Sequence, residues 1–166
     1  NAIDYLSWRG DLTFDKSPVN EVDIFILSQI STVDFKDIIP EDGQIRLGDA
    51  FKEFFKIDGV NESRGVLQSQ YVMTMYNILK DTPRFKDLLL RHQVKHFDEK
   101  RAEQFSAITI VLPDGSICVS FRGTDDTIIG WKEDCNLSVY KKVPAQKDAV
   151  NYLLSEASYD KSSLIR

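Results

Sequence analysis

The feature of this chain that most constrains its fold is a pair of apolar segments joined by a tight-turn sequence. Segments 105–112 and 116–121 are rich in Ile, Val and Phe, and Pro113-Asp114-Gly115 separates them. β-Branched and aromatic residues favour strands, whereas Pro, Asp and Gly supply the backbone angles of a turn. The pattern therefore predicts a β-hairpin made of two central strands.

Helical patterns lie on both sides of this hairpin. Asn20 is a typical helix cap ahead of Glu21 and Asp23, and apolar residues follow at helical spacing, which predicts a well-buried helix. The same spacing predicts helices over about 47–57, 63–79 and 145–157, a further helix from about Ile128, and a short helix over 83–90. The charged segment 91–104 is expected to be a polar connection. His92 and His96 fall within it and are expected to serve surface or hydrogen-bonding roles.

Each long helix carries an apolar stripe that is expected to pack in the core rather than line a binding pocket. The expected stripes are Val22, Phe25, Ile26 and Ile30, widened by Ile24 and Leu27, in the first helix; Leu47, Phe51, Phe54 and Phe55 in the second; Leu67, Tyr71, Met75 and Ile78 in the third; and Ala149, Val150, Leu153 and Leu154 in the last.

Helices that alternate with strands in this way predict an α/β fold. The sheet is expected to be incomplete and mixed, because a strand starting near residues 163–165 would lie parallel to the strand that ends at Phe121, next to the antiparallel hairpin. No repeat or linker divides the chain, so one domain is expected over residues 1–166. Its first part, about 1–92, is expected to be mainly helical, and about 93–166 to hold the strands and remaining helices.

Composition and charge exclude several classes of function. The formal charge is -5, and Lys and Arg form no cluster suited to phosphates, so no nucleic-acid partner is expected. The apolar runs are far shorter than the ~20 residues that cross a bilayer, so no transmembrane span is expected. No metal-ligand spacing or phosphate loop is present, and no cofactor is expected. With no export signal visible, and with Cys118 and Cys135 interpreted as reduced thiols, the predicted location is the cytoplasm.

The strongest functional signal is Phe121-Arg122-Gly123-Thr124-Asp125-Asp126, which follows a predicted strand and precedes a helix that carries Trp131. One interpretation is structural, because Asp and Thr often cap a helix start. The other is catalytic. Ester cleavage by serine builds negative charge on the carbonyl oxygen, and fixed N–H donors lower the barrier; in α/β hydrolases one donor comes from a strand-to-helix loop of this kind. Both roles are compatible in one loop.

The motif Phe121-Arg122-Gly123-Thr124, followed by Gly130-Trp131-Lys132-Glu133-Asp134, is similar to the oxyanion loop of class 3 lipases, the fungal-type triacylglycerol lipases. The chain resembles more closely a bacterial lipase-like family of uncharacterised proteins within the α/β hydrolase superfamily. Further residues that carry this resemblance are Tyr5-Leu6-Ser7-Trp8-Arg9-Gly10-Asp11, Asn20-Glu21-Val22-Asp23, Gln104-Phe105, Pro144-Ala145-Gln146 and Tyr152-Leu153.

The resemblance implies that Thr124 is the oxyanion residue and that Asp134 accepts a hydrogen bond from its hydroxyl, with Asp125 a weaker candidate for that task. It also implies a nucleophile elbow further along the chain. The sequence contains no G-x-S-x-G, so the serine, the acid and the histidine of the triad are expected after Arg166. This chain alone is therefore expected to be inactive.

Two functions from different classes follow from this reasoning. In the first, the chain is the N-terminal part of a serine ester hydrolase that acts on an ester or lipid-like small molecule. In the second, it is a non-catalytic binding or structural domain, since fold similarity does not determine chemistry. A catalytic Cys–His pair is a minor alternative. The strand that ends at Phe121 is expected to leave an exposed sheet edge, covered by a second copy or by the rest of the protein.

Overall fold

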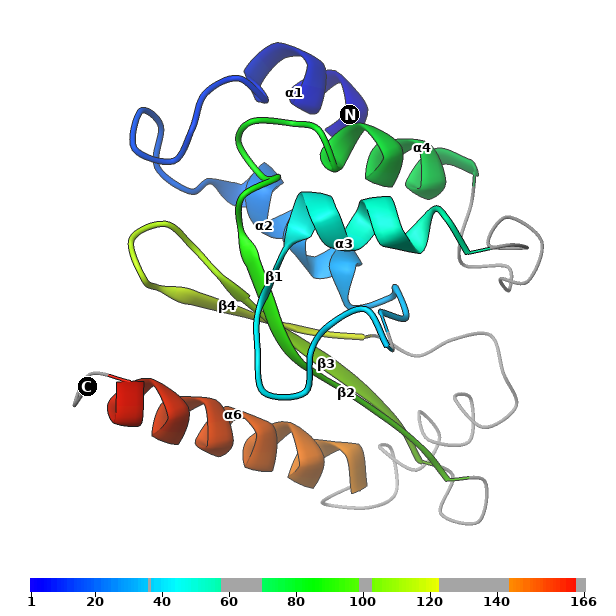
Figure 1. Cartoon of the computed structure of the whole chain (residues 1–166), viewed down its shortest axis with the longest axis vertical. Coiled ribbons are helices and arrows are strands. Elements are labelled where there is room, and N and C mark those ends of the chain that lie inside the picture. The colour runs from blue at the N-terminus through cyan, green and yellow to red at the C-terminus, as the bar shows by residue number, and fades with distance from the viewer. Residues whose placement is uncertain (36, 58–69, 99–102, 123–143, 164–166) are drawn as a thin grey trace.

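The computed structural model describes residues 1–35, 37–57, 70–98, 103–122 and 144–163. These residues form five helices and four strands, which confirms the predicted α/β class (Figure 1). The elements in chain order are α1 (Ala2–Arg9), α2 (Glu21–Ile30), β1 (Ile45–Arg46), α3 (Leu47–Phe54), α4 (Gln70–Leu79), β2 (Leu89–Asp98), β3 (Glu103–Val111), β4 (Ile117–Phe121) and α6 (Pro144–Ser163).

The predicted hairpin is present at one side of the sheet, where β3 is an inner strand and β4 is an edge strand among the described residues, rather than the expected pair of central strands. β3 pairs with β4 in antiparallel register, from Val111 opposite Ile117 to Ala107 opposite Phe121. The turn between them uses Gly115 at φ +84°, a conformation that favours glycine. The Oδ1 atom of Asp114 accepts the amide of Ser116 at 2.9 Å. The structure therefore confirms both the predicted hairpin and the roles of Asp114 and Gly115 in its turn.

The sheet has the order β1-β2-β3-β4, and every pairing among the described residues is antiparallel. The parallel strand that was expected to begin near Ser163 is not there at that residue, because α6 continues through Ser163. Residues 164–166 lie outside the described part of the chain. The described sheet is thus antiparallel rather than mixed.

The expectation for residues 83–104 was wrong. Residues 83–87 form turns instead of a short helix, and β2 occupies most of the segment that was expected to be a polar connection. β2 pairs with β3 from Leu89 opposite Val111 to Asp98 opposite Glu103, with an irregularity between Arg91 and Val94. The sequence did not predict β2 because most of its side chains are polar, and a strand pattern is recognised chiefly by apolar residues.

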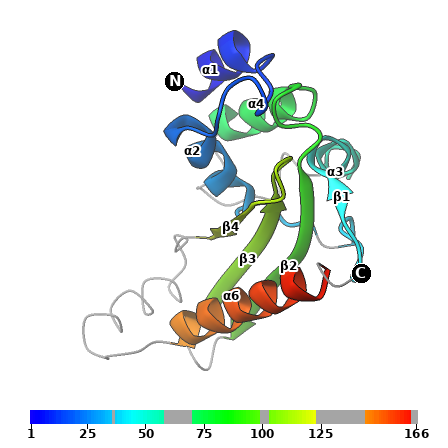
Figure 2. The same cartoon turned by 90° about the vertical axis from the view of Figure 1, so that its left-hand side faces the viewer.

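β3 is buried on both faces, and its side chains alternate between two helical layers. Ile108 and Ile110 pack in the large core formed with α1–α4, while Phe105 and Ala107 pack against α6 in a second, smaller cluster. Successive side chains of a strand point to opposite faces, which explains this division. Figures 1 and 2 show the four earlier helices gathered on one side of the sheet and α6 lying across β2 and β3 on the other.

The large core is rich in aromatic rings. Phe51 of α3 stacks on Tyr76 of α4 with ring centroids 4.9 Å apart, and its ring meets that of Phe35 edge-on at 5.2 Å. Leu47, Phe51 and Phe54 are buried, so the α3 stripe is largely confirmed. In α4 the buried residues are Met75, Tyr76 and Leu79, whereas the expected Tyr71 is exposed.

α2 begins where the sequence predicts and is less buried than expected. The Oδ1 atom of Asn20 accepts the amides of Val22 and Asp23 at 2.9 and 3.2 Å, which confirms the cap. Ile26, Leu27 and Ile30 are buried, but Val22, Ile24 and Phe25 are exposed. Asp23 is fully buried on the face that packs inward. One polar residue therefore takes a core position that the apolar pattern did not assign to it.

Gly48 marks a close contact between α3 and the turn after α4. A Cβ atom at this position would lie 2.5 Å from the backbone oxygen of Lys80 and 3.1 Å from Cβ of Lys86. We therefore expect Gly48→Ala to lower the free energy of unfolding by about 1–3 kcal/mol through overpacking, even though alanine is the better helix former by roughly 1 kcal/mol. Urea unfolding followed by circular dichroism measures this. Lys52→Ala, at an exposed position of the same helix, is the control and is expected to change stability by less than about 0.5 kcal/mol; equal midpoints for the two variants would contradict the prediction.

Candidate functional site

The predicted oxyanion residues lie outside the described part of the chain. Thr124, Asp125 and Asp134 all fall in residues 123–143, for which no structure is described, as do Trp131 and Cys135. The structure does describe both flanks of this segment. β4 and Arg122 precede it, and α6 follows it directly at Pro144.

The preceding flank is fixed to the sheet by hydrogen bonds. The amide of Arg122 donates to the carbonyl of Ser106 at 2.9 Å, so backbone pairing continues one residue beyond β4. The hydroxyl of Ser120 donates to the carbonyl of Ser28 in α2 at 3.0 Å. The chain therefore leaves the sheet from a fixed point between β3 and α2.

An aromatic group lies at the same end of the hairpin. The ring of Phe121 is 6.0 Å from that of Phe105 and 6.2 Å from that of Tyr152 of α6. Phe121 remains 38% exposed. β4 has one partner strand, β3, among the described residues, so its other edge carries no strand from this part of the chain.

The following flank, α6, is attached to the sheet by a polar cluster. The Glu156 carboxylate is 2% exposed. Its Oε2 atom accepts hydrogen bonds from Nε and Nη2 of Arg91 at 3.1 and 3.0 Å. Its Oε1 atom lies 2.5 Å from Nδ1 of His92. The hydroxyl of Tyr152 donates to the carbonyl of His92 at 2.9 Å and contacts Oγ1 of Thr109 at 2.7 Å. Burial raises the pKa of Tyr152 well above its ordinary value, so the phenol remains protonated at neutral pH. A buried ion pair with every oxygen of Glu156 partnered holds α6 on the strands.

The apolar stripe predicted for α6 is wrong in three of its four positions. Val150, Leu153 and Leu154 are exposed, and the face that meets the sheet carries Ala149 and Tyr152 together with Glu156. A charged residue can occupy this inner face because Arg91 supplies a buried countercharge.

Among the described residues, neither histidine pairs with Cys118, and Cys135, the other thiol of the minor Cys–His alternative, lies outside them. Within the described residues, His92 contacts Glu156 and His96 contacts Asp148, 3.1 Å from its Nδ1. Cys118 is a free thiol packed against the large core, and burial raises its pKa, which disfavours the reactive thiolate. The hydrogen-bonding roles expected for both histidines are present, although on a strand rather than in a connection.

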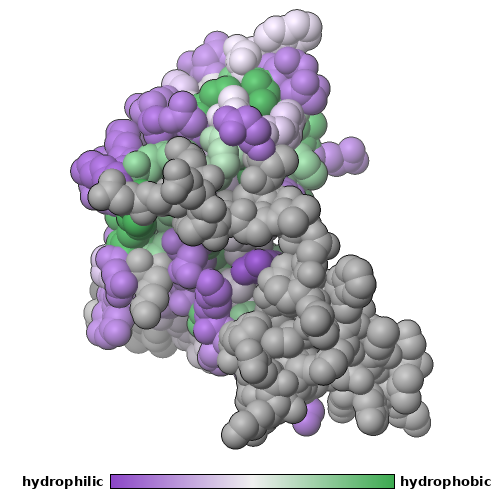
Figure 3. Space-filling model, turned by 90° about the vertical axis from the view of Figure 1, so that its right-hand side faces the viewer, coloured by the Kyte–Doolittle hydropathy of each residue, from purple (hydrophilic) through white to green (hydrophobic). Residues whose placement is uncertain are grey.

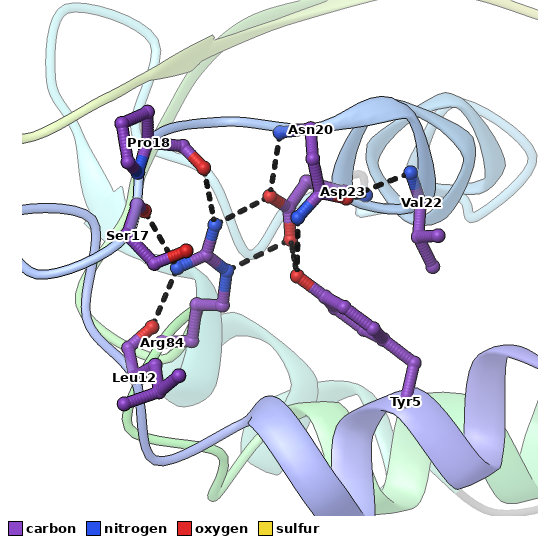
Figure 4. Close-up of polar contacts among 8 residues, drawn as sticks. All are labelled: Tyr5, Leu12, Ser17, Pro18, Asn20, Val22, Asp23 and Arg84. Atoms are coloured by element: carbon purple, nitrogen blue, oxygen red, sulfur yellow. Dashed lines mark hydrogen bonds and ion pairs between the residues drawn. The ribbon is translucent and has the colours of Figure 1, made fainter.

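A second buried polar network joins α1, α2 and the turn after α4 (Figure 4). The guanidinium of Arg84 donates to both oxygens of Asp23, at 2.8 and 2.5 Å, and to three backbone carbonyls. These carbonyls belong to Leu12, Ser17 and Pro18, at distances of 2.5, 3.0 and 3.1 Å. All five N–H groups of the guanidinium are thereby used. The Asp23 carboxylate raises the pKa of Arg84 above its already high ordinary value.

Tyr5 and Asn20 complete this network. The Tyr5 hydroxyl donates to Oδ1 of Asp23 at 2.9 Å and accepts from the Asn20 amide group at 2.8 Å. Burial raises the pKa of Tyr5, and the hydrogen bond from Asn20 offsets part of this. Because no donor of Arg84 is left to bind a ligand, the network is structural rather than catalytic. Sequence reasoning missed Arg84, which lies 61 positions from Asp23 and carries no local signal.

The described surface offers little else that resembles a binding site. An open depression beside α3 is lined by Asp49, Lys52, Glu53, Phe55, Lys56 and Lys80. Its charges are paired along the helix, Lys52 with Asp49 at 3.6 Å and Lys56 with Glu53 at 2.7 Å. In the coloured part of Figure 3, hydrophilic residues surround small hydrophobic areas. Among the residues that the structure describes, no group of three or more His, Cys, Asp or Glu side chains is placed to hold a metal ion.

Comparison with known families finds a match in the second half of the chain. The Mbeg1-like family model matches residues 79–165, just over half of the chain. The chain belongs to the Mbeg1-like family. The matched segment of this Mbeg1-like chain includes β2, β3, β4 and α6, and with them the cluster around Glu156. No curated protein and no solved structure matches the chain. No helix in the described residues has the length and apolar character needed to span a membrane.

Proposed function

We propose that this chain carries the oxyanion loop of a serine ester hydrolase, similar to lipases and esterases, whose nucleophile lies outside these 166 residues. Thr124 offers its amide and hydroxyl to the oxygen that becomes negative in the tetrahedral intermediate. Asp134 accepts from the Thr124 hydroxyl and orients it, and Asp125 is the second candidate for that task. The substrate is an ester or lipid-like small molecule, and no cofactor takes part.

One observation carries this proposal. The bond from the Arg122 amide to Ser106 fixes the backbone at the residue that directly precedes Gly123-Thr124. An oxyanion donor contributes most when it is held in place before the reaction begins, because no reorganisation is then needed in the transition state. The paired residue Arg122, directly before Gly123-Thr124, supports this requirement. The resemblance of Phe121-Arg122-Gly123-Thr124 to the lipase loop supplies the chemistry.

The alternative is a non-catalytic binding or structural domain of the same family. It is favoured by the two buried networks, around Arg84 and Glu156, which hold the elements together with their charges fully paired. Among the described residues these are the most deeply buried charges. Under this alternative, Gly123-Thr124-Asp125 serves only as a helix cap.

A fluorophosphonate probe, which labels activated serines, separates the two functions. We expect the complete protein to be labelled at one serine outside residues 1–166 and to hydrolyse short 4-nitrophenyl esters, while the isolated chain remains unlabelled. The heat-denatured complete protein is the control for non-specific reaction. Stoichiometric labelling of a serine within residues 1–166 would contradict the assignment of the nucleophile. A folded complete protein that shows neither labelling nor hydrolysis would favour the binding domain.

The proposal places this enzyme in the cytoplasm, consistent with the free Cys118 thiol. It also includes an association at the outer edge of β4, where a strand from a second copy or from the remainder of the protein would pair. Phe121 at that edge is apolar and partly exposed, and a neighbouring strand would cover it.

A further inference from the structure

The only two histidines of the chain lie on one strand, and each contacts a carboxylate of the same helix. The irregularity between Arg91 and Val94 shortens β2, so His92 and His96 are about 10 Å apart along the strand. Their partners Glu156 and Asp148 are about 12 Å apart along α6. Because these two spacings are similar, a single docked position of α6 satisfies both pairs at once. Figure 2 shows α6 lying across β2 and β3 in that position.

Among the residues that the structure describes, the apolar contribution to the docking of α6 is small. Counted over the described part of the chain, the cluster between α6 and the sheet has three buried members, Phe105, Ala107 and Tyr152, whereas the core on the other face has nineteen. The large apolar residues of α6, Val150, Leu153 and Leu154, are exposed. The docking of α6 therefore depends more on polar contacts than the docking of the helices on the opposite face does.

His92 combines an unusual backbone conformation with a side-chain contact outside the sheet. It lies in the left-handed region at φ +52°, within the irregularity of β2 between Arg91 and Val94. A non-glycine residue in this conformation costs free energy that its contacts must offset. Its Nδ1 contacts the buried Glu156, and its ring meets that of Tyr159 at 4.7 Å. The side chain is nevertheless 25% exposed, so protons reach it from solvent.

We propose that α6 is a pH-sensitive latch, docked on β2 more firmly when His92 and His96 are protonated and released more easily when they are neutral. An imidazole gains or loses its charge between about pH 5 and pH 8, while Asp and Glu carboxylates remain charged over that range. When its imidazole is protonated, each histidine forms an ion pair with a carboxylate of α6. When its imidazole is neutral, the charge attraction is absent, and at most a hydrogen bond to that carboxylate remains.

Other charged groups adjust the size of this effect. Arg91 binds the same carboxylate as His92 and repels a protonated imidazole, which reduces the gain at that pair. Lys95 lies between the two histidines in sequence and pairs with Asp34 at 2.7 Å. The hydroxyl of Tyr152 and the ring of Tyr159 face His92 from α6, and burial raises the pKa of Tyr152, so its phenol remains neutral at these pH values. His96 is 59% exposed, so solvent screens its pair with Asp148.

Hydrogen exchange of the α6 amides in the full chain tests the latch, with each rate corrected for the intrinsic pH dependence of exchange. We expect the opening constant of α6 to rise about fivefold between about pH 5.5 and pH 8, the size expected of two part-exposed ion pairs. The amides of β3 are expected to show no comparable change. This prediction stands on contacts of the described residues and does not depend on hydrolase activity.

Two histidine variants and one matched control complete the test. The double variant His92→Asn and His96→Gln is expected to remove the pH response, and asparagine tolerates the left-handed backbone at position 92. His96→Gln alone, at an exposed position where folding is not at risk, is expected to remove about half of the response on a logarithmic scale. Lys95→Gln breaks an exposed pair on the same strand that does not involve α6, and is expected to leave the response intact.

An α6 opening constant that is equal at both pH values would overturn the latch. So would an unchanged pH response in either histidine variant, since the charge would then act elsewhere. An equal pH response in β3 and α6 would show a change of global stability instead of a local release, and would also count against the proposal.

Discussion

Replacing Arg84 with leucine is expected to lower the free energy of unfolding by about 3–5 kcal/mol, because the variant leaves the Asp23 carboxylate buried without its countercharge. Asp23 and Arg84 are 0% and 3% exposed, so water cannot replace the lost partner without opening the core. The same change leaves the carbonyls of Leu12, Ser17 and Pro18 without their donor. Urea unfolding of the full chain, followed by circular dichroism, measures the loss.

Two further variants separate the network from a general effect of removing arginine. Arg46→Leu removes an exposed guanidinium that lies 3.9 Å from Asp87, and is expected to change stability by less than about 0.5 kcal/mol. Arg84→Lys keeps the charge but not the planar set of five donors, so it is expected to recover only part of the loss. If Arg84→Leu unfolds within about 1 kcal/mol of the wild type, the network contributes far less than its burial implies.

The elements that the sequence predicts well are those whose signal is local. The hairpin of β3 and β4 follows from apolar segments around Pro113-Asp114-Gly115, and α2 begins at Asn20 because its side chain caps the next turn. α3 follows from the spacing of Leu47, Phe51 and Phe54. In each case the residues that determine the element lie within a few positions of one another.

The elements that the sequence does not predict depend on partners far along the chain. β2 is stabilised by contacts of Arg91 and His92 with Glu156, which is more than sixty positions away. Without that partner in view, the segment has the composition of a polar loop. The same holds for Arg84 and Asp23, and it explains why the inner faces of α2 and α6 were assigned to apolar residues that are in fact exposed.

The residues that carry the family resemblance include two groups with different roles. Tyr5, Asn20 and Asp23 belong to the structural network of Arg84, so their pattern reports the fold. The segment from Gly123 to Asp134 belongs to the proposed site and lies outside the described residues. Sequence reasoning therefore locates the candidate site by its motif, while the structure adds the fixed strand before it and the helix after it.

The Thr124 hydroxyl is the most direct point at which to test the proposed chemistry. In the complete protein, we expect Thr124→Val to lower kcat for ester hydrolysis by about 100- to 1,000-fold, the usual effect of removing one oxyanion donor. KM is expected to change little, because the oxygen gains its negative charge only in the transition state. Steady-state hydrolysis of 4-nitrophenyl esters measures both constants, and fluorophosphonate labelling confirms that the serine is still present and accessible.

The choice of variants makes this result specific to the hydroxyl at position 124. Thr124→Ser retains a hydroxyl and is expected to recover most of the lost rate, whereas Thr127→Val removes a hydroxyl from the same segment and is expected to have little effect. Valine matches threonine in shape, so a folded Thr124→Val protein differs chiefly in its hydrogen bond. If its kcat equals that of the wild type, the hydroxyl takes no part in the reaction, and only the backbone amide of residue 124 remains as a donor. If Thr124→Val and Thr127→Val lose activity equally, the loss reflects packing of the segment instead of stabilisation of charge.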